Sequence, residues 1–143
     1  MKILVTGVCG QLGYDVCKVL DARKIENRGV DLADFDITDA QATHDYIAAY
    51  RPDAVIHCSA WTAVDKAEDE LDKVRAVNTE GPRNIAKVCK EIGAKMLYIS
   101  TDYVFPGTGG RFYEPDDPTG PLGAYGSTKI GGELAVKEQL DNY

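Results

Sequence analysis

Three glycines placed directly after a short apolar run constrain the fold of this chain more than any other feature. The run is Lys2–Thr6, and the glycines are Gly7, Gly10 and Gly13. A short β-branched run predicts a buried strand, and the glycines predict a tight turn into a helix. The free backbone N–H groups at the start of such a helix form a site for a pyrophosphate. The pattern therefore predicts a dinucleotide-binding loop, with a purely structural turn as the alternative.

The rest of the chain alternates helical and strand patterns. Helices are predicted over Leu12–Leu20, Asp39–Ala49, Asp65–Val77, a segment that starts at Gly81-Pro82 and stops at Gly93, and Ala124–Leu140. Further strands are predicted near Gly29–Leu32, over Ala54–Cys58 and over Lys95–Ser100. Pro106–Gly123 has too little periodicity for a buried element and is predicted to be a long surface loop. This alternation predicts the α/β class, as a doubly wound parallel sheet of the Rossmann type.

The domain organisation follows from the number of strands. With 143 residues, one domain is expected, an NAD(P)-binding Rossmann-type domain over 1-143. Only four strands are visible in the pattern, whereas a complete fold of this type has about six or seven. We therefore expect the domain to be incomplete, truncated before a C-terminal substrate-binding part.

Composition narrows the class of ligand. The net charge is -7, and no run of Lys or Arg marks a nucleic-acid or anionic-membrane surface. No apolar stretch approaches the ~18 residues of a membrane span, and Gly7 interrupts any secretion signal, so a cytoplasmic protein is expected. The four cysteines form no CxxC pair and have no histidine at metal spacing, so neither a disulfide framework nor a metal site is predicted. A small-molecule ligand is expected.

One acidic residue stands where a dinucleotide ribose would be bound. Asp31 follows the glycine loop at close to the ~20-residue offset of a carboxylate that binds the adenosine ribose. That position favours NAD over NADP, while the nearby Arg28 leaves NADPH open. The alternative is that Asp31, Asp34, Asp36 and Asp39 form a solvated acidic loop and helix cap.

Tyr125 and Lys129 form the strongest chemical pattern. Residues four apart share a helix face, so the Lys129 ammonium can make the Tyr125 phenol a usable proton donor. Thr101, at the carboxyl end of the strand over Lys95–Ser100, can donate a hydrogen bond to the same substrate oxygen. Together these groups would polarise a ketone. A solvent-facing helix pair is the alternative, and the glycine loop upstream argues against it.

Four segments, which span essentially the whole chain, carry more specific patterns: Gly7–Gly13, Ala60–Glu68 (AWTAVDKAE), Ser100–Phe105 (STDYVF) and Tyr125–Glu133 (YGSTKIGGE). Together they resemble the dTDP-4-dehydrorhamnose reductase family of extended short-chain dehydrogenases/reductases. The GxxGxxG spacing at Gly7 is the variant seen in extended short-chain dehydrogenases. The TAVDKAE and STDYVF strings are far more specific than the general dehydrogenase motifs. The chain departs from the family at Phe105-Pro106-Gly107, where an acidic residue often precedes the glycine, and at Trp61, where a smaller aromatic residue is usual.

The resemblance implies a reaction and a set of site residues. It implies NADH- or NADPH-dependent reduction of the C4 ketone of a dTDP-4-dehydro-6-deoxy sugar, for polysaccharide precursor synthesis, and a possible homodimer in the full-length form. The catalytic residues implied are Thr101, Tyr125 and Lys129. The cofactor-binding residues implied are Gly7, Gly10, Gln11, Leu12, Gly13, Asp31, Asp36, Ile37, Ser59, Ala60, Thr62, Tyr125 and Lys129.

Two other functions fit parts of the pattern. A nucleotide-sugar epimerase or dehydratase shares the glycine loop and the Tyr/Lys pair, but Tyr103 stands where such dehydratases tend to carry a glutamate. A non-catalytic regulatory subunit, like that of methionine adenosyltransferase, keeps the fold without needing a proton donor. The presence of Thr101, Tyr125 and Lys129 favours the enzyme.

Overall fold

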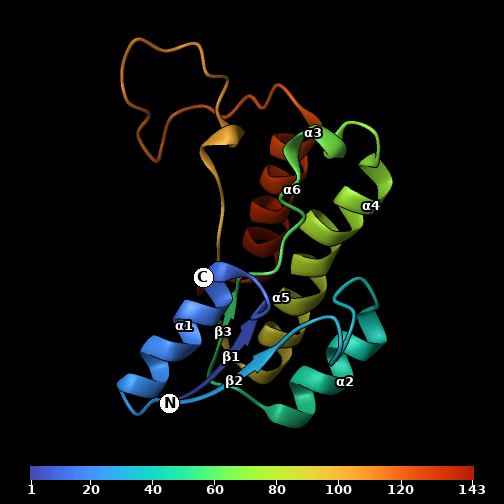
Figure 1. The fold of residues 1–143 in the computed structure, drawn as a ribbon, viewed down its shortest axis with the longest axis vertical. Helices are drawn as coiled ribbons and strands as arrows, with labels where there is room; N and C mark the ends of the chain where they lie inside the picture. The colour runs from blue at the N-terminus through green and yellow to red at the C-terminus, as the bar shows by residue number, and fades with distance from the viewer.

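The computed structural model describes residues 1–143 as one α/β unit (Figure 1). The strands are β1 (Lys2–Thr6), β2 (Glu26–Val30), β3 (Ala54–His57) and β4 (Lys95–Tyr98). The α-helices are α1 (Gln11–Ala22), α2 (Ala40–Tyr50), α3 (Val64–Ala67), α4 (Leu71–Arg75), α5 (Gly81–Ile92) and α6 (Ala124–Gln139). Two shorter elements are the π-helical turn η1 (Ala76–Glu80) and the 3₁₀ turn η2 (Asp102–Val104). No helix is long and apolar enough to cross a membrane.

The four strands form one parallel sheet in the order β2-β1-β3-β4. The chain moves from β1 outward to β2 and then crosses back over β1 to reach β3. The strand order therefore reverses between β1 and β3, where Thr6 pairs in register with His57. In open parallel sheets, ligands bind outside the carboxyl ends of the strands at such a reversal. The predicted fold class is confirmed.

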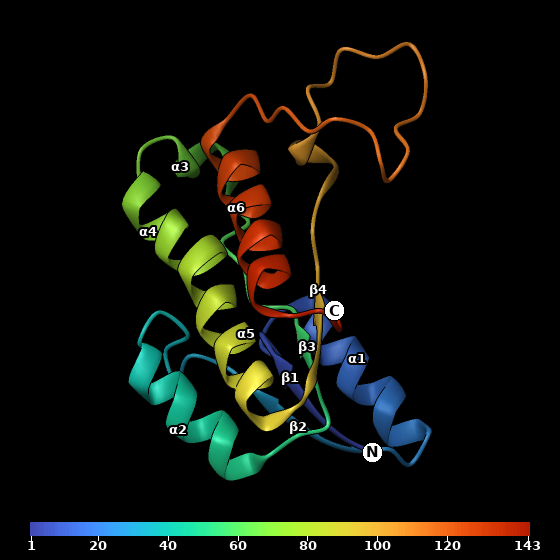
Figure 2. The ribbon, with the colours of Figure 1, turned by 180° about the vertical axis from the view of Figure 1, so that it is seen from behind.

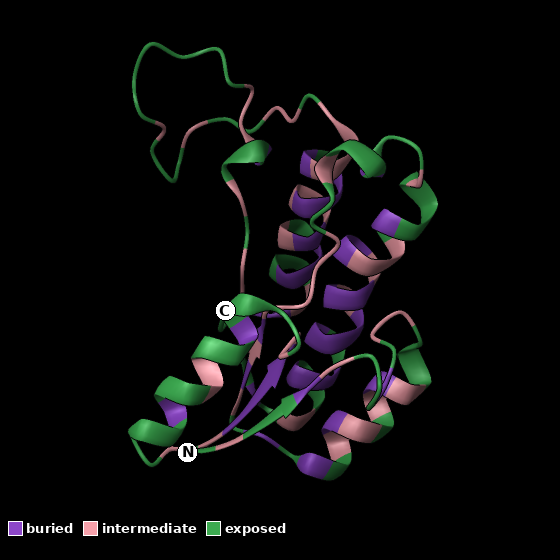
Figure 3. Ribbon diagram, viewed as in Figure 1, coloured by how far each residue is buried: buried purple, intermediate pink, exposed green.

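The two faces of the sheet are covered unequally. Leu4, Val55 and Met96 belong to the main core cluster and point to the face covered by α2 and α5. On that face α6 packs beside α5. Ile3 and Val5 point to the other face and pack on Leu20 of α1. Figures 1 and 2 show α1 alone on its side. In Figure 3 the central strands and the inner side of α5 are buried, whereas the loop over 106–123 is exposed or half-buried along its length.

The helix predicted to start at Gly81-Pro82 is confirmed as α5, which runs from Gly81 to Ile92. It continues without a break from α4 and the π-helical turn η1, so Leu71–Ile92 forms one helical segment. The sequence pattern did not predict this π-helical turn, because its hydrogen bonds join residues five apart and so depart from the 3.6-residue period of an α-helix. In contrast, the helix predicted over Asp65–Val77 is divided into α3 and α4 around Glu68–Glu70. The end predicted at Gly93 is confirmed, with a left-handed φ of 73°.

A histidine on the surface links α2 to α5 and should make stability depend on pH. The His44 Nε2 lies 3.1 Å from Glu91 Oε2, and its Nδ1 lies 3.2 Å from Asp45 Oδ1. The hydrogen bond to Asp45 raises the pKa of His44 against the opposing effect of desolvation, and Glu91 adds to the rise. This contribution is fully present below the unfolded pKa of about 6.5 and is lost as pH rises through the higher folded pKa. His44→Gln should therefore flatten the fall in melting temperature between acidic and mildly alkaline pH, and an unchanged profile would exclude the linkage.

Candidate functional site

A cavity of about 650 Å³ lies along the carboxyl ends of the strands. Its wall takes residues from the ends of β1, β2 and β3, from the segment after β4, and from α6. Every residue predicted to bind the cofactor lines this cavity: Gly7, Gly10, Gln11, Leu12, Gly13, Asp31, Asp36, Ile37, Ser59, Ala60, Thr62, Tyr125 and Lys129. The structure thus brings together positions more than a hundred residues apart. A volume of this size is within the range of small-molecule sites, roughly 300–1,000 Å³.

The glycine loop is held tightly against the sheet. Gly7 adopts a φ of +74°, and its N–H donates to the Val30 carbonyl at 2.9 Å. A Cβ on Gly13 would lie 2.3 Å from the Gly7 oxygen, so helix α1 can pack this closely only with glycine there. Gly10, at the N-cap of α1, has no side-chain hydrogen bond that would cap the helix. The first N–H groups of α1 are therefore free to meet an anion.

The end of the cavity near β2 is acidic. Asp31 Oδ2 accepts the Cys9 N–H at 2.8 Å, and Asp31 Oδ1 accepts the Leu32 N–H at 2.9 Å. Burial alone would raise the pKa of Asp31, but these two backbone hydrogen bonds lower it, so the group is a carboxylate at neutral pH. Arg28 lies away from this end, with its guanidinium 4.5 Å from the centre of the Tyr50 ring in a separate groove. Lys129 is the one cationic side chain in the cavity wall.

Lys129 is a buried ammonium, only 3% exposed. Its Nζ donates to the Ile99 carbonyl at 2.6 Å and lies 4.3 Å from the centre of the Tyr98 ring. Burial lowers the pKa of Lys129 to about 8, although Glu133 opposes that effect. At neutral pH the lysine therefore still carries its charge, one helical turn beyond Tyr125.

A neutral histidine forms the wall beside this lysine. His57 Nδ1 lies 2.7 Å from Thr6 Oγ1, and the ring stacks on Tyr98 at 5.9 Å between centroids. Burial lowers the pKa of His57 to about 3, and the charge on Lys129 adds to the effect. His57 is therefore uncharged at neutral pH and does not repel the ammonium. Its Nε2 is buried and has no hydrogen-bond partner.

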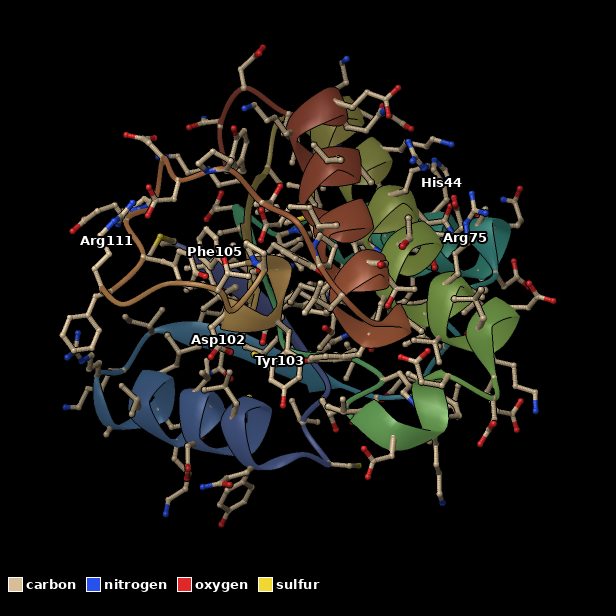
Figure 4. The ribbon with its side chains drawn as sticks, turned by 90° about the horizontal axis from the view of Figure 1, so that it is seen from above. His44, Arg75, Asp102, Tyr103, Phe105 and Arg111 are labelled. Atoms are coloured by element: carbon tan, nitrogen blue, oxygen red, sulfur yellow. The ribbon has the colours of Figure 1, made fainter.

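Thr101, the third predicted catalytic residue, does not line the cavity. Its Oγ1 accepts the Tyr103 N–H at 3.3 Å and so caps η2, while its neighbour Ser100 does line the cavity. The Tyr103 ring packs edge-on against the Tyr125 ring, with 5.5 Å between centroids. Figure 4 shows Asp102 and Tyr103 on the η2 turn, which packs beside α6, with Arg111 farther out on the long loop.

Asn78 holds the segment after β3 in place, a role that the sequence analysis did not predict. Its Oδ1 accepts the Trp61 N–H at 2.8 Å, and its Nδ2 donates to the Trp61 carbonyl at 3.1 Å. The same Nδ2 donates to Thr128 Oγ1 on α6 at 3.3 Å. Asn78 lies on the π-helical turn η1, so it connects the wall formed by Ala60 and Thr62 to the helix that carries Lys129. No local pattern marks Asn78, because its partners Trp61 and Thr128 lie far from it in the sequence.

Glu68 explains why the TAVDKAE string matters to the site. Its Oε1 accepts the Ala124 N–H at 2.8 Å, at the first residue of α6. A carboxylate at a helix N-terminus satisfies a free N–H and complements the helix dipole. A side chain on Gly123 would collide with this carboxylate, since its Cβ would lie 2.7 Å from Oε1. The string therefore fixes the start of the helix that presents Tyr125.

The cavity wall also contains residues that the sequence analysis did not select. They are Thr6, Cys9, Val30, Leu32, Phe35, His57, Cys58, Val77, Ile99 and Ser100. Most of these are the last residue of a strand or lie within two residues after it, and the rule that ligands bind at strand ends was the signal that could have found them. Phe35 and Val77 come from a loop and a helix, and no local pattern marks them.

Comparison with known proteins places the chain in one protein family. The family model described as the RmlD substrate binding domain matches residues 1–143. The dTDP-4-dehydrorhamnose reductase of Streptomyces griseus is 50% identical over 137 residues, which cover 96% of this chain and 45% of that protein. The chain spans about half the length of the relatives that it matches.

Solved structures agree with this placement. A dTDP-4-dehydrorhamnose reductase from Clostridium acetobutylicum matches 100% of this chain and 51% of its own, with a TM-score of 0.98 and 40% identity. The enzyme of the same name from Bacillus anthracis, in complex with NADP, matches 100% of this chain and 52% of its own, with a TM-score of 0.96 and 37% identity.

Proposed function

The chain belongs to the RmlD substrate binding domain family, and from this premise we propose that residues 1–143 are the nicotinamide-dinucleotide-binding domain of a dTDP-4-dehydrorhamnose reductase. The observation that carries the proposal is the single cavity that joins the glycine loop, Asp31 and the Tyr125/Lys129 pair. The reaction proposed is reduction of the C4 ketone of a dTDP-4-dehydro-6-deoxy sugar with NADH or NADPH. The sugar nucleotide is the proposed small-molecule partner.

The residues present fit a dinucleotide. The glycine loop leaves the first N–H groups of α1 open, and the close contact of Gly13 with the Gly7 backbone holds α1 tightly against that loop. Asp31 is an ionised acceptor for ribose hydroxyls at one end of the cavity. Lys129 supplies donors for the nicotinamide ribose at the other end. Ser59, Ala60 and Thr62 line the middle.

The chain's own residues supply the proton and stabilise the charge. The bound nicotinamide supplies the hydride. Tyr125 donates its phenolic proton to the C4 oxygen, and the Lys129 ammonium stabilises the phenolate left behind. Thr101 is the proposed second donor to that oxygen, because it follows Ser100 in the segment that lines the cavity.

We further propose that NADH is preferred over NADPH. A 2′-phosphate would meet the Asp31 carboxylate, and no arginine lines the cavity to bind it. Arg28, the candidate that left NADPH open, stacks on Tyr50 instead. The Bacillus anthracis relative was solved in complex with NADP, so both dinucleotides are compared in the test.

Replacing Asp31 with asparagine tests the site and the preference together. Wild type should bind NADH at least about tenfold more tightly than NADPH, and Asp31→Asn should remove most of that difference, because a hydrogen bond to a charged group is worth about 1.5–3 kcal/mol. Titration followed by nicotinamide fluorescence measures both affinities. Asp15→Ala, which removes a charge from the exposed side of α1, is the matched control. Equal wild-type affinities would refute the preference, and no saturable binding to a folded chain would refute the proposed function.

A further inference from the structure

Glu133 is a carboxylate next to the site that the proposed chemistry does not use. It lies on α6 four residues after Lys129 and eight after Tyr125, so the three side chains follow one another along one side of the helix. Its Oε1 accepts a hydrogen bond from the Ser100 hydroxyl. Ser100 lines the cavity directly before Thr101. Glu133 therefore joins α6 to the segment that follows β4.

The lysine needs a balancing charge. An ammonium removed from water loses a large hydration energy, which must be offset by nearby partners. Two uncharged partners contact the Lys129 ammonium: the Ile99 carbonyl, to which it donates a hydrogen bond, and the face of the Tyr98 ring. The titratable groups that act on it are His57 from β3 and Glu133 from α6, and the Tyr98 ring from β4 lies against it. Glu133 is the one carboxylate among them, whereas His57 is neutral at pH 7 and burial raises the pKa of Tyr98.

We propose that Glu133 is a positioning residue, which holds Ser100 against α6 and supplies the negative charge that keeps the buried Lys129 ammonium protonated. Its effect on Lys129 acts through space, since the lysine donates its hydrogen bond to Ile99. The two contacts, Lys129 to Ile99 and Glu133 to Ser100, fasten the helix to the strand end at successive residues. The proposal rests on the proposed function only in assigning Lys129 to catalysis.

Two variants separate the charge from the hydrogen bond. Glu133→Gln keeps an amide oxygen that accepts from Ser100 but removes the charge, whereas Ser100→Ala keeps the charge and removes the hydroxyl. The pKa of Lys129 is read from the NMR titration of its ε-CH₂ group, assigned by its loss in Lys129→Arg. Glu138→Gln is the matched control, because it removes one negative charge from the same helix at a residue that pairs with Arg83.

The expected result is specific to the charge. Glu133→Gln should lower the pKa of Lys129 by about one unit, while Ser100→Ala and Glu138→Gln should leave it near the wild-type value of about 8. An unchanged pKa in Glu133→Gln would overturn the electrostatic role. Amide exchange tests the hydrogen bond: Ser100→Ala and Glu133→Ala should speed exchange after β4 and Glu133→Gln should not, and equal protection in all three would overturn the positioning role.

These measurements are made without cofactor or substrate, so they are independent of the proposed reaction. A shifted lysine pKa in a chain that binds no dinucleotide would leave the role of Glu133 standing and refute the function. Intact NADH binding with an unshifted pKa of Lys129 in Glu133→Gln would leave the proposed function standing and refute the electrostatic role of Glu133.

Discussion

Replacing Gly13 with alanine should destroy the dinucleotide site. The new Cβ would lie 2.3 Å from the Gly7 carbonyl oxygen and 2.7 Å from the Gly7 carbonyl carbon, and both atoms belong to backbone that is itself hydrogen-bonded to β2. The loop or the helix must therefore move. Overpacking of this kind costs about 1–3 kcal/mol of folding stability. A similar loss of loop geometry would weaken NADH binding roughly 30-fold or more.

Gly10→Ala is the control for this prediction. Gly10 has a φ of -87°, which any residue adopts, and its Cβ would meet only the Gly7 oxygen, at 3.3 Å. We expect Gly10→Ala to keep its stability within about 1 kcal/mol of wild type. Thermal melting compares the stabilities of the two variants, and NADH titration of Gly13→Ala against wild type measures the loss of binding. If Gly13→Ala melts and binds like wild type, the close contact between helix and loop is not what builds the site.

The sequence predicted the parts of this protein that depend on local pattern. The strand, glycine loop and first helix were recognisable because sterics confine that turn to glycine, and Tyr125 and Lys129 because helical spacing places them on one face. The boundary of the weak second strand was placed too late, at Gly29–Leu32 instead of Glu26–Val30, because β2 is an edge strand with mostly exposed side chains. Edge strands lack the apolar signature that buried strands carry.

The supporting residues could not be predicted, because their roles depend on distant partners. Asn78 matters through Trp61 and Thr128, and Glu68 through Ala124, across separations of 17 to 56 residues. Nothing in the local sequence distinguishes Glu68 from the other acidic residues around it. His57 was passed over because it ends an ordinary buried strand, and its neutrality follows only from full burial beside Lys129.

Replacing Tyr125 with phenylalanine should abolish reduction while leaving the cofactor site intact. Phenylalanine keeps the ring, and with it the edge-on contact with Tyr103 at 5.5 Å. The fold should therefore be retained, and the NADH affinity should change by no more than about threefold. It cannot donate a proton to the C4 oxygen, and a positioned proton donor contributes typically about 10²–10⁴-fold to the rate. The loss of activity is measured as the rate of NADH oxidation by a dTDP-4-dehydro-6-deoxy sugar, with an enzyme preparation that is active as wild type. A loss of less than about tenfold would be smaller than a proton donor contributes, and it would mean that another group protonates the sugar. Tyr125 would then serve only to line the cavity, and Thr101 would become the group to test next.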